Sequence, residues 1–180
     1  MALAGSSVGL LLSLCGASVA KDSIVVVSDV PGVGKHPAQR GDLLLLHYVG
    51  TLDDGTVFDS TRGGLAYRDG GAGVLRPVAL RLGGSPTPGL TEGLQQALEG
   101  MTVGGTRSVT VPASLGFGGS GSLAPYAFVA PGANLNYSVE LLRLSTVGPD
   151  NLMSGIQRCS AGGASQAAER CGQISIAEFL

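Results

Sequence analysis

Short apolar segments, separated by turn residues, predict a small β-sheet. The run Leu43–Leu46 is apolar on both faces, which is typical of a strand that is covered on each side. Asp54-Gly55 separates this run from a second strand that ends on Phe58-Asp59, and Asp-Gly between two strands is a strong hairpin signal. Further strands are predicted at residues 23–27, 78–82, 106–111 and 135–144. In the segment 106–111 apolar and polar residues alternate, so one face is expected to be buried and the other to meet solvent.

One segment has the periodicity of a helix. Residues 88–99 carry Leu90, Leu94 and Leu98 at four-residue spacing, which predicts a short amphipathic helix. Pro88 suits its first position and Gly100 its end. Residues 29–40 are predicted to be a loop, and the glycine-rich residues 63–76 a flexible insertion. The pattern therefore predicts an α+β fold, with an antiparallel sheet wrapped around one helix.

Composition limits the function classes. A chain of 180 residues is expected to hold one domain with tails, and we place the boundaries at 1–20, 21–145 and 146–180. A net charge of −2 with 13% charged residues provides no basic field for nucleic acid. The two histidines and three cysteines are not at metal-ligand spacing, so no metal centre is expected.

The first 20 residues have the features of an export leader. They carry no charged side chain, Val8–Leu14 is apolar, and the small residues Ser18 and Ala20 suit a signal-peptidase site just before Lys21. We favour a cleaved leader. An N-terminal anchor or core helix is the alternative, and the missing basic region would also suit a piece of a longer bipartite transit sequence.

Residues 47–60 contain a recognisable motif. They read His47-Tyr48-x-Gly50-x-Leu52-x-x-Gly55-x-x-Phe58-Asp59-Ser60. This pattern closely resembles the first signature of the FK506-binding-protein (FKBP) family of peptidyl-prolyl isomerases. Later segments are similar to further family elements in family order, and together they cover roughly residues 21–145; they lie at 82–83, 89–94, 101–107, 111–118 and 130–142. The resemblance implies a half-barrel around one helix and acceleration of Xaa-Pro isomerisation in proline-containing polypeptides.

The resemblance also implies the site. An FKBP site is an apolar cup for the proline ring that needs no metal or cofactor. The implied catalytic residues are Tyr48, Phe58, Asp59, Phe117 and Tyr137, and the implied substrate-binding residues are Val78, Thr87, Leu90 and Phe128. Two simpler interpretations stay open: Tyr48 is an ordinary core residue, or Asp59 caps the turn at residues 60–61 or pairs with Arg62.

Several implied site residues depart from the family pattern. Leu90 stands where the family has the Trp of the pocket floor, and Phe117 replaces a Tyr whose hydroxyl can bind the substrate carbonyl. Val78 replaces an aromatic residue, Tyr137 replaces Phe, and the segment 85–88 around Thr87 is one residue short. We therefore expect reduced activity and weak FK506 binding. The alternative is a non-catalytic binding module of the same fold.

The C-terminal tail contains two cysteines, Cys159 and Cys171. In an oxidising compartment we expect them to pair, which would stabilise the fold by about 3 kcal/mol in a chain-entropy treatment; two unpaired thiols are the alternative. Exported FKBP-like domains with paired cysteines resemble the thylakoid-lumen branch of the family, which implies photosynthetic complex subunits as partners. A bacterial periplasmic protein is the alternative. We expect a monomer, and an alanine-rich helix at residues 164–180.

Overall fold

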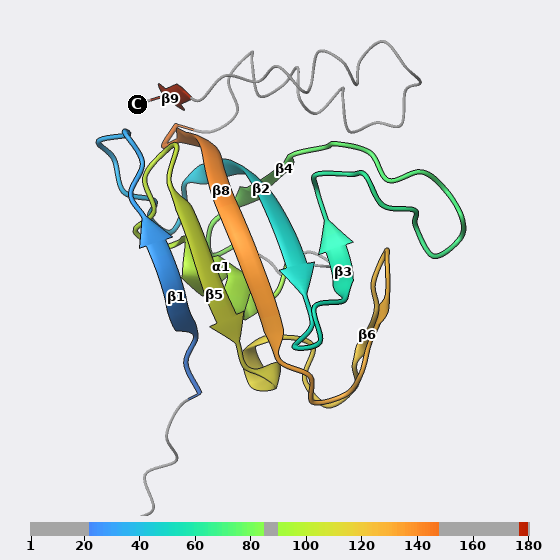
Figure 1. Cartoon of the computed structure of the whole chain (residues 1–180). Helices are drawn as coiled ribbons and strands as arrows, with labels where there is room; N and C mark the ends of the chain where they lie inside the picture. The colour runs from blue at the N-terminus through green and yellow to red at the C-terminus, as the bar shows by residue number, and fades with distance from the viewer. Residues whose placement is uncertain (1–21, 85–89, 148–176, 180) are drawn as a thin grey trace, which may run out of the picture.

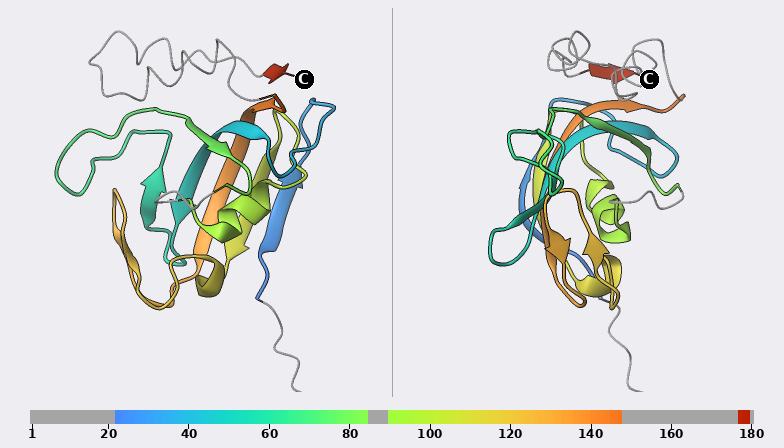
Figure 2. Two further views of the ribbon diagram at one scale, coloured as in Figure 1. Left: turned by 180° about the vertical axis from the view of Figure 1, so that it is seen from behind. Right: turned by 90° about the vertical axis from the view of Figure 1, so that its right-hand side faces the viewer.

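The structure, a computed structural model, describes residues 22–84, 90–147 and 177–179. Its centre is a seven-stranded sheet in the order β1-β5-β8-β2-β3, with β4 paired to β2 and β9 paired to β8. The strands are β1 (Val25–Val30), β2 (Leu43–Thr51), β3 (Val57–Ser60), β4 (Val78–Arg81), β5 (Thr106–Val111), β8 (Leu135–Ser145) and β9 (Ala177–Phe179). Figures 1 and 2 show the sheet curving around α1 (Glu92–Leu98), which lies on its concave side. The predicted α+β half-barrel is confirmed.

Strands β2 and β8 form the centre of the sheet. They pair antiparallel from Leu43↔Ser145 to Thr51↔Asn136, with an irregularity in register between Leu45 and Leu46. Leu44 and Leu46 lie in the main core against the helix, whereas Leu45 packs with Leu142 in a second, smaller cluster. This strand is therefore buried on both faces, as its continuous apolar run predicts.

The helix begins later than the sequence pattern predicts. It starts at Glu92 rather than at residue 88, because Thr91 is its N-cap and the Thr91 side chain accepts a hydrogen bond from the backbone N–H of Leu94 at 3.2 Å. Leu90 therefore precedes the helix, although it is buried in the same core as Leu94 and Leu98. On the inner side of the helix, Gly93 allows close approach to the sheet, since a Cβ there would lie 2.2 Å from Cγ1 of Val111.

The glycine-rich insertion folds back on itself into a hairpin-like arm. Isolated bridges join Arg62 to Leu75 and Ala66 to Ala72, and the Arg76 backbone N–H donates to the Thr61 carbonyl at 2.7 Å. The arm extends beyond β3 at the edge of the sheet (Figure 1). We name residues 63–76 the insertion arm.

Further features differ from the sequence predictions. Strand β1 runs to Val30 rather than ending at Val27, because its pairing with β5 continues to Val30↔Thr106. A small hairpin of β6 (Ser122–Leu123) and β7 (Phe128–Val129) was not predicted, and a 3-10 turn, η1, covers Ala113–Leu115. Residues 177–179 form a strand parallel to β8 instead of a helix end.

Other predictions fall outside the described residues: the leader at 1–20, Thr87, the cysteines Cys159 and Cys171, and the rest of the predicted C-terminal helix. Within the described ranges, no helix has the length and apolar character that crossing a bilayer requires.

Candidate active site

Three aromatic rings from three different strands meet on the concave face of the sheet. Tyr48 comes from β2, Phe58 from β3 and Tyr137 from β8. The Tyr137 ring centroid lies 6.0 Å from that of Tyr48 and 5.7 Å from that of Phe58, and both pairs meet edge to face. This is a preferred geometry of aromatic pairs, because the positive edge of one ring meets the negative face of the other. The structure therefore brings these three predicted residues together.

The position of Phe58 depends on Gly50. These residues lie on neighbouring strands, where Gly50 pairs with Asp59, next to Phe58. A Cβ at Gly50 would lie only 2.5 Å from Cζ of the Phe58 ring, so the ring lies directly over a backbone that has no side chain there. This packing explains why the His-Tyr-x-Gly motif and the Phe-Asp pair occur together. The glycine makes room for the ring.

Asp59 is the polar member of the cluster. Its Oδ2 accepts a hydrogen bond from the Tyr48 hydroxyl at 2.6 Å, and its Oδ1 accepts one from the Ser60 backbone N–H at 2.8 Å. Burial raises the pKa of the Asp59 carboxyl above its ordinary value, although both hydrogen bonds act in the opposite direction. Arg62 forms its ion pair with Glu140. Asp59 thus serves the local turn and also fixes the Tyr48 hydroxyl.

The tyrosine hydroxyls of the cluster are held in their neutral form. Burial is the main cause that raises the pKa of Tyr48, and the neighbouring Asp59 charge adds to it. Burial also raises the pKa of Tyr137, whose hydroxyl lies 3.5 Å from the Thr91 hydroxyl at the start of the helix. Neither tyrosine can therefore act as an anionic base near neutral pH. The site offers apolar surface and neutral hydrogen-bond donors.

The remaining predicted residues lie at different depths. Phe117 is half-buried and its ring centroid lies 6.0 Å from that of Phe58. Val78 also packs against the core while partly exposed, and Leu90 is fully inside it. Phe128, by contrast, is exposed on the β6–β7 hairpin and does not join the aromatic cluster.

The aromatic cluster is tightly closed. Phe58 has 0% of its surface exposed, Tyr137 2% and Tyr48 5%. Among the predicted site residues that the structure describes, Phe117, Val78 and Asp59 are partly exposed and Phe128 is exposed, so these surfaces are open to a proline ring. The three innermost rings are therefore a floor and wall rather than an open cup.

The sequence of residues 34–142 identifies the family of the chain. Residues 34–142, more than half of the chain, match the family described as FKBP-type peptidyl-prolyl cis-trans isomerase. The chain belongs to this family. The FKBP resemblance inferred from residues 47–60 is confirmed.

Named relatives come from plants, animals and bacteria. The chloroplastic peptidyl-prolyl cis-trans isomerase FKBP17-2 of Arabidopsis thaliana is 38% identical over 117 residues, which are 63% of this chain and 45% of that protein. Human FKBP2 is 36% identical, over 59% of this chain and 64% of that protein. An FK506-binding protein of Neisseria meningitidis is 34% identical, over 68% of this chain and 96% of that protein. The chain thus spans less than two thirds of the length of its Arabidopsis and human relatives.

A likeness to solved structures was also found. The crystal structure of AtFKBP13 is 27% identical to the chain, with a TM-score of 0.48, and the match covers 66% of this chain and 88% of that one.

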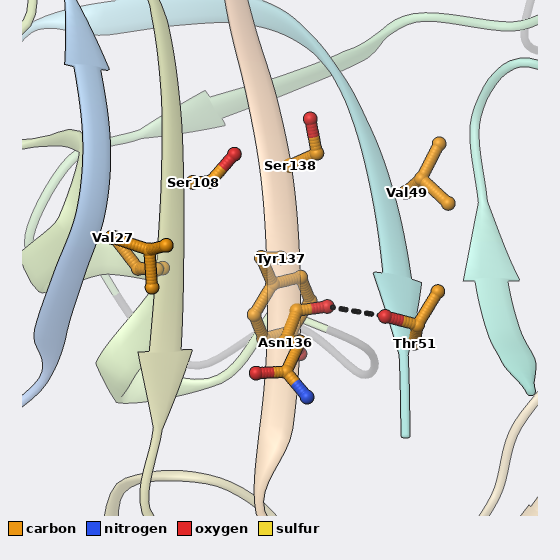
Figure 3. A pocket seen from close by; sticks show the side chains of 8 residues that line it. Val27, Val49, Thr51, Ser108, Asn136, Tyr137 and Ser138 are labelled. Carbon is orange, nitrogen blue, oxygen red and sulfur yellow. Dashed lines mark hydrogen bonds between the residues drawn. The ribbon is translucent and has the colours of Figure 1, made fainter. Parts of the chain in front are cut away.

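The outer face of the FKBP sheet carries a separate, shallow groove of about 250 Å³ (Figure 3). Short side chains line it, among them Val49, Ser108 and Ser138, and the Thr51 hydroxyl donates to the Asn136 carbonyl across it at 3.4 Å. Side chains alternate along β8, so Asn136 and Ser138 face this groove while the Tyr137 ring lies in the core. This groove is not part of the aromatic site.

Sequence reasoning missed two contacts of the site. The Tyr126 backbone N–H donates to the Phe58 carbonyl at 3.0 Å, which ties the β6–β7 hairpin to the strand that holds Phe58 and Asp59. The Tyr126 ring packs against Tyr67 of the insertion arm at a centroid distance of 5.0 Å. Both tyrosines stand in glycine-rich loops without periodicity, so the sequence carries no signal that would pair them.

Proposed function

We propose that this domain accelerates rotation about Xaa-Pro bonds in polypeptides, as a peptidyl-prolyl cis-trans isomerase. The uncatalysed rotation has a barrier of about 18–20 kcal/mol and takes tens to hundreds of seconds. The planar amide is more polar than the twisted transition state, so a dry apolar surface destabilises the planar form relative to the twisted one. The observation that carries this proposal is the convergence of Tyr48, Phe58, Phe117 and Tyr137 beside the Tyr48–Asp59 hydrogen bond.

The residues divide into two roles. Phe58, Tyr48 and Tyr137 form the dry floor and wall, since each is almost fully buried. Phe117 and Val78 offer their partly exposed surfaces to the proline ring, and Asp59 is the polar group beside the rotating amide. Leu90, buried in the same core, is proposed to hold the position of the pocket-floor Trp of the FKBP pattern, and Phe128 and Thr87 are proposed to contact the substrate further out. The proline-containing chain supplies the reacting bond, and the domain supplies only its environment.

The activity is proposed to be reduced. Leu90 offers less apolar contact than the Trp of the FKBP pattern, and full burial of a large apolar side chain is worth roughly 1.5–3 kcal/mol. Phe117 lacks a hydroxyl, and one hydrogen bond contributes about 0.5–1.5 kcal/mol. The same losses should weaken FK506 binding.

A proline-limited refolding assay with the full chain tests the proposal. Wild type should accelerate refolding, Asp59→Ala should slow it relative to wild type, and Leu90→Trp should make it faster. Asp53→Ala is the matched control, because Asp53 is an exposed carboxylate whose Oδ1 accepts from Asn136, outside the aromatic cluster. Circular dichroism confirms that each variant is folded. Rates equal to the uncatalysed rate in wild type and in both site variants would refute the isomerase function.

A second candidate is a non-catalytic binding module with the same fold. The near-complete burial of Phe58, Tyr137 and Tyr48 favours it, because a closed floor leaves little room for a proline ring. Under this function the chain binds proline-containing segments without accelerating their isomerisation. Titration with a proline peptide, followed by NMR shifts of residues near Phe117, separates the two: shifts without acceleration favour the binding module.

We further propose that residues 21–145 form the FKBP domain of an exported protein, with residues 1–20 as leader and 146–180 as a tail. The chloroplastic FKBP17-2 relative supports a chloroplast compartment, and we propose the thylakoid lumen, with photosynthetic complex subunits as partners; the bacterial periplasm is the alternative. We propose a monomer, in which Cys159 pairs with Cys171. Mass spectrometry after thiol alkylation tests the pairing, and size-exclusion chromatography with light scattering tests the monomer.

A further inference from the structure

Two hairpins that are distant in sequence meet beside the candidate site. The Arg68 backbone N–H in the insertion arm donates to the Pro125 carbonyl in the β6–β7 hairpin at 2.9 Å, and the Tyr67 and Tyr126 rings pack together next to this bond. A groove of about 400 Å³ lies where the two hairpins meet, and this volume is within the range of ligand sites, roughly 300–1,000 Å³. Its lining residues are Tyr67, Arg68, Asp69, Leu123, Ala124 and Pro125. We name it the flanking groove.

The flanking groove lies beside the aromatic site. Tyr126 follows the lining residue Pro125 and is hydrogen-bonded through its backbone to the Phe58 carbonyl, one residue from Asp59. An extended chain spans about 3.3–3.6 Å per residue. Residues that flank a proline bound at Asp59 therefore come within reach of the groove after only a few steps along the chain.

The chemistry of the flanking groove suits an apolar, uncharged segment. Leu123 has 71% of its surface exposed, and its cross-strand partner Phe128 is also exposed. Neighbouring exposed apolar side chains are typical of an interaction surface. The two charged residues of the lining, Arg68 and Asp69, have opposite signs, so the groove gives no attraction to a strongly charged partner.

We propose that the flanking groove binds apolar residues that lie a few positions away from the proline of an unfolded client polypeptide, an inference that rests on the proposed isomerase function. Its consequence is substrate selection. A protein substrate with apolar residues around its proline gains contacts in the groove, whereas a tetrapeptide is too short to reach it. The insertion arm and the β6–β7 hairpin would therefore raise the specificity of the domain for unfolded proteins.

The test compares two substrates with one groove variant. Leu123→Ser removes an exposed apolar side chain, and Val33→Ser is the matched control, because Val33 is 86% exposed and lies in the loop that is hydrogen-bonded to Val103, away from the groove. We expect Leu123→Ser to lower kcat/KM for a refolding protein by about tenfold, less than the full value of a buried leucine. The kcat/KM for succinyl-Ala-Leu-Pro-Phe-p-nitroanilide should stay unchanged, and Val33→Ser should change neither.

A binding measurement separates failure of the groove from failure of the isomerase function. Reduced, carboxymethylated α-lactalbumin, which is permanently unfolded, serves as the probe in fluorescence anisotropy with the full chain. Leu123→Ser should weaken its binding about tenfold relative to wild type and to Val33→Ser, whether or not the wild type is catalytic. Equal binding by all three chains, or an equal loss of activity on tetrapeptide and protein, would overturn the flanking groove. An inactive wild type that still shows the binding loss would overturn the isomerase proposal alone.

Discussion

The hydrogen bond between Tyr48 and Asp59 should have a strength that depends on pH. Its oxygen–oxygen distance of 2.6 Å is typical of a hydroxyl that donates to an ionised carboxylate. A hydrogen bond to a charged group contributes about 1.5–3 kcal/mol, and one between neutral groups about 0.5–1.5 kcal/mol. Tyr48→Phe should therefore lower the free energy of unfolding by about 1.5–3 kcal/mol at a pH where Asp59 is ionised, and by only about 0.5–1.5 kcal/mol at a lower pH where it is protonated.

The direction of this pH dependence follows from the pKa of Asp59. Burial raises this pKa in the folded protein, so the protonated carboxyl is favoured by folding, and that contribution is lost as the pH rises through the folded pKa. The Tyr48 hydroxyl opposes the rise. Without it the pKa of Asp59 moves further up, and the variant loses more stability than wild type as Asp59 ionises.

Urea unfolding at several pH values measures both quantities. Tyr137→Phe is the matched control, because it removes the same hydroxyl from a ring of the same cluster, but that hydroxyl has only a 3.5 Å contact with Thr91. Its effect should be small and independent of pH. An equal cost of Tyr48→Phe at the lower and the higher pH, or the same pH slope in Tyr137→Phe, would contradict the reasoning.

Three further predictions concern the fold. Gly93→Ala gains about 1 kcal/mol of helix propensity, but its Cβ would lie 2.2 Å from Cγ1 of Val111, and such overpacking costs about 1–3 kcal/mol. Urea unfolding should therefore show net destabilisation, and a stabilised variant would contradict the position of the helix. Burial and a nearby guanidinium lower the pKa of His47, so the free energy of unfolding should decrease as the pH falls below about 6.5. In unfolding titrations His47→Asn should flatten this dependence of stability on pH, and an unchanged dependence would contradict the role of His47. Gly73→Ala places a Cβ 2.4 Å from the Leu65 carbonyl oxygen in the insertion arm, whereas a Cβ at Gly71 would meet only side-chain atoms, Oδ1 of Asp69 at 3.2 Å and Cδ2 of Tyr67 at 3.4 Å. Amide exchange in the arm should speed up in the first variant and not in the second.

The central strands could be predicted because their signals are local. The apolar run Leu43–Leu46 and the turn at Asp54-Gly55 each favour one structure without help from the rest of the chain. The helix start could not be placed, because the leucine spacing extends to Leu90 and Pro88 suits a first helical position. In the structure the Thr91 hydroxyl caps the helix, and this contact decides where it begins.

Contacts between distant loops lay beyond what the sequence could predict. Strands β6 and β7 have two residues each, too few for any periodicity. The packing of Tyr67 on Tyr126 joins residues 59 positions apart, and nothing in either loop indicates the partner. The aromatic cluster was accessible only through the family motif, because spacing alone does not show that Phe58 lies over Gly50.

Asp59 also helps to decide whether the aromatic cluster is an isomerase site or an ordinary hydrophobic core. Burial raises its pKa, so keeping this carboxylate ionised at neutral pH costs free energy that an uncharged side chain would not. The turn needs only one acceptor for the Ser60 N–H, which serine or asparagine could provide. A perturbed carboxylate against three aromatic rings is the arrangement expected where chemistry, rather than stability, decides the residue. Stability alone would favour Asp59→Asn. If this variant has a higher free energy of unfolding but a lower isomerase rate than wild type, the carboxylate is kept for activity at the expense of stability.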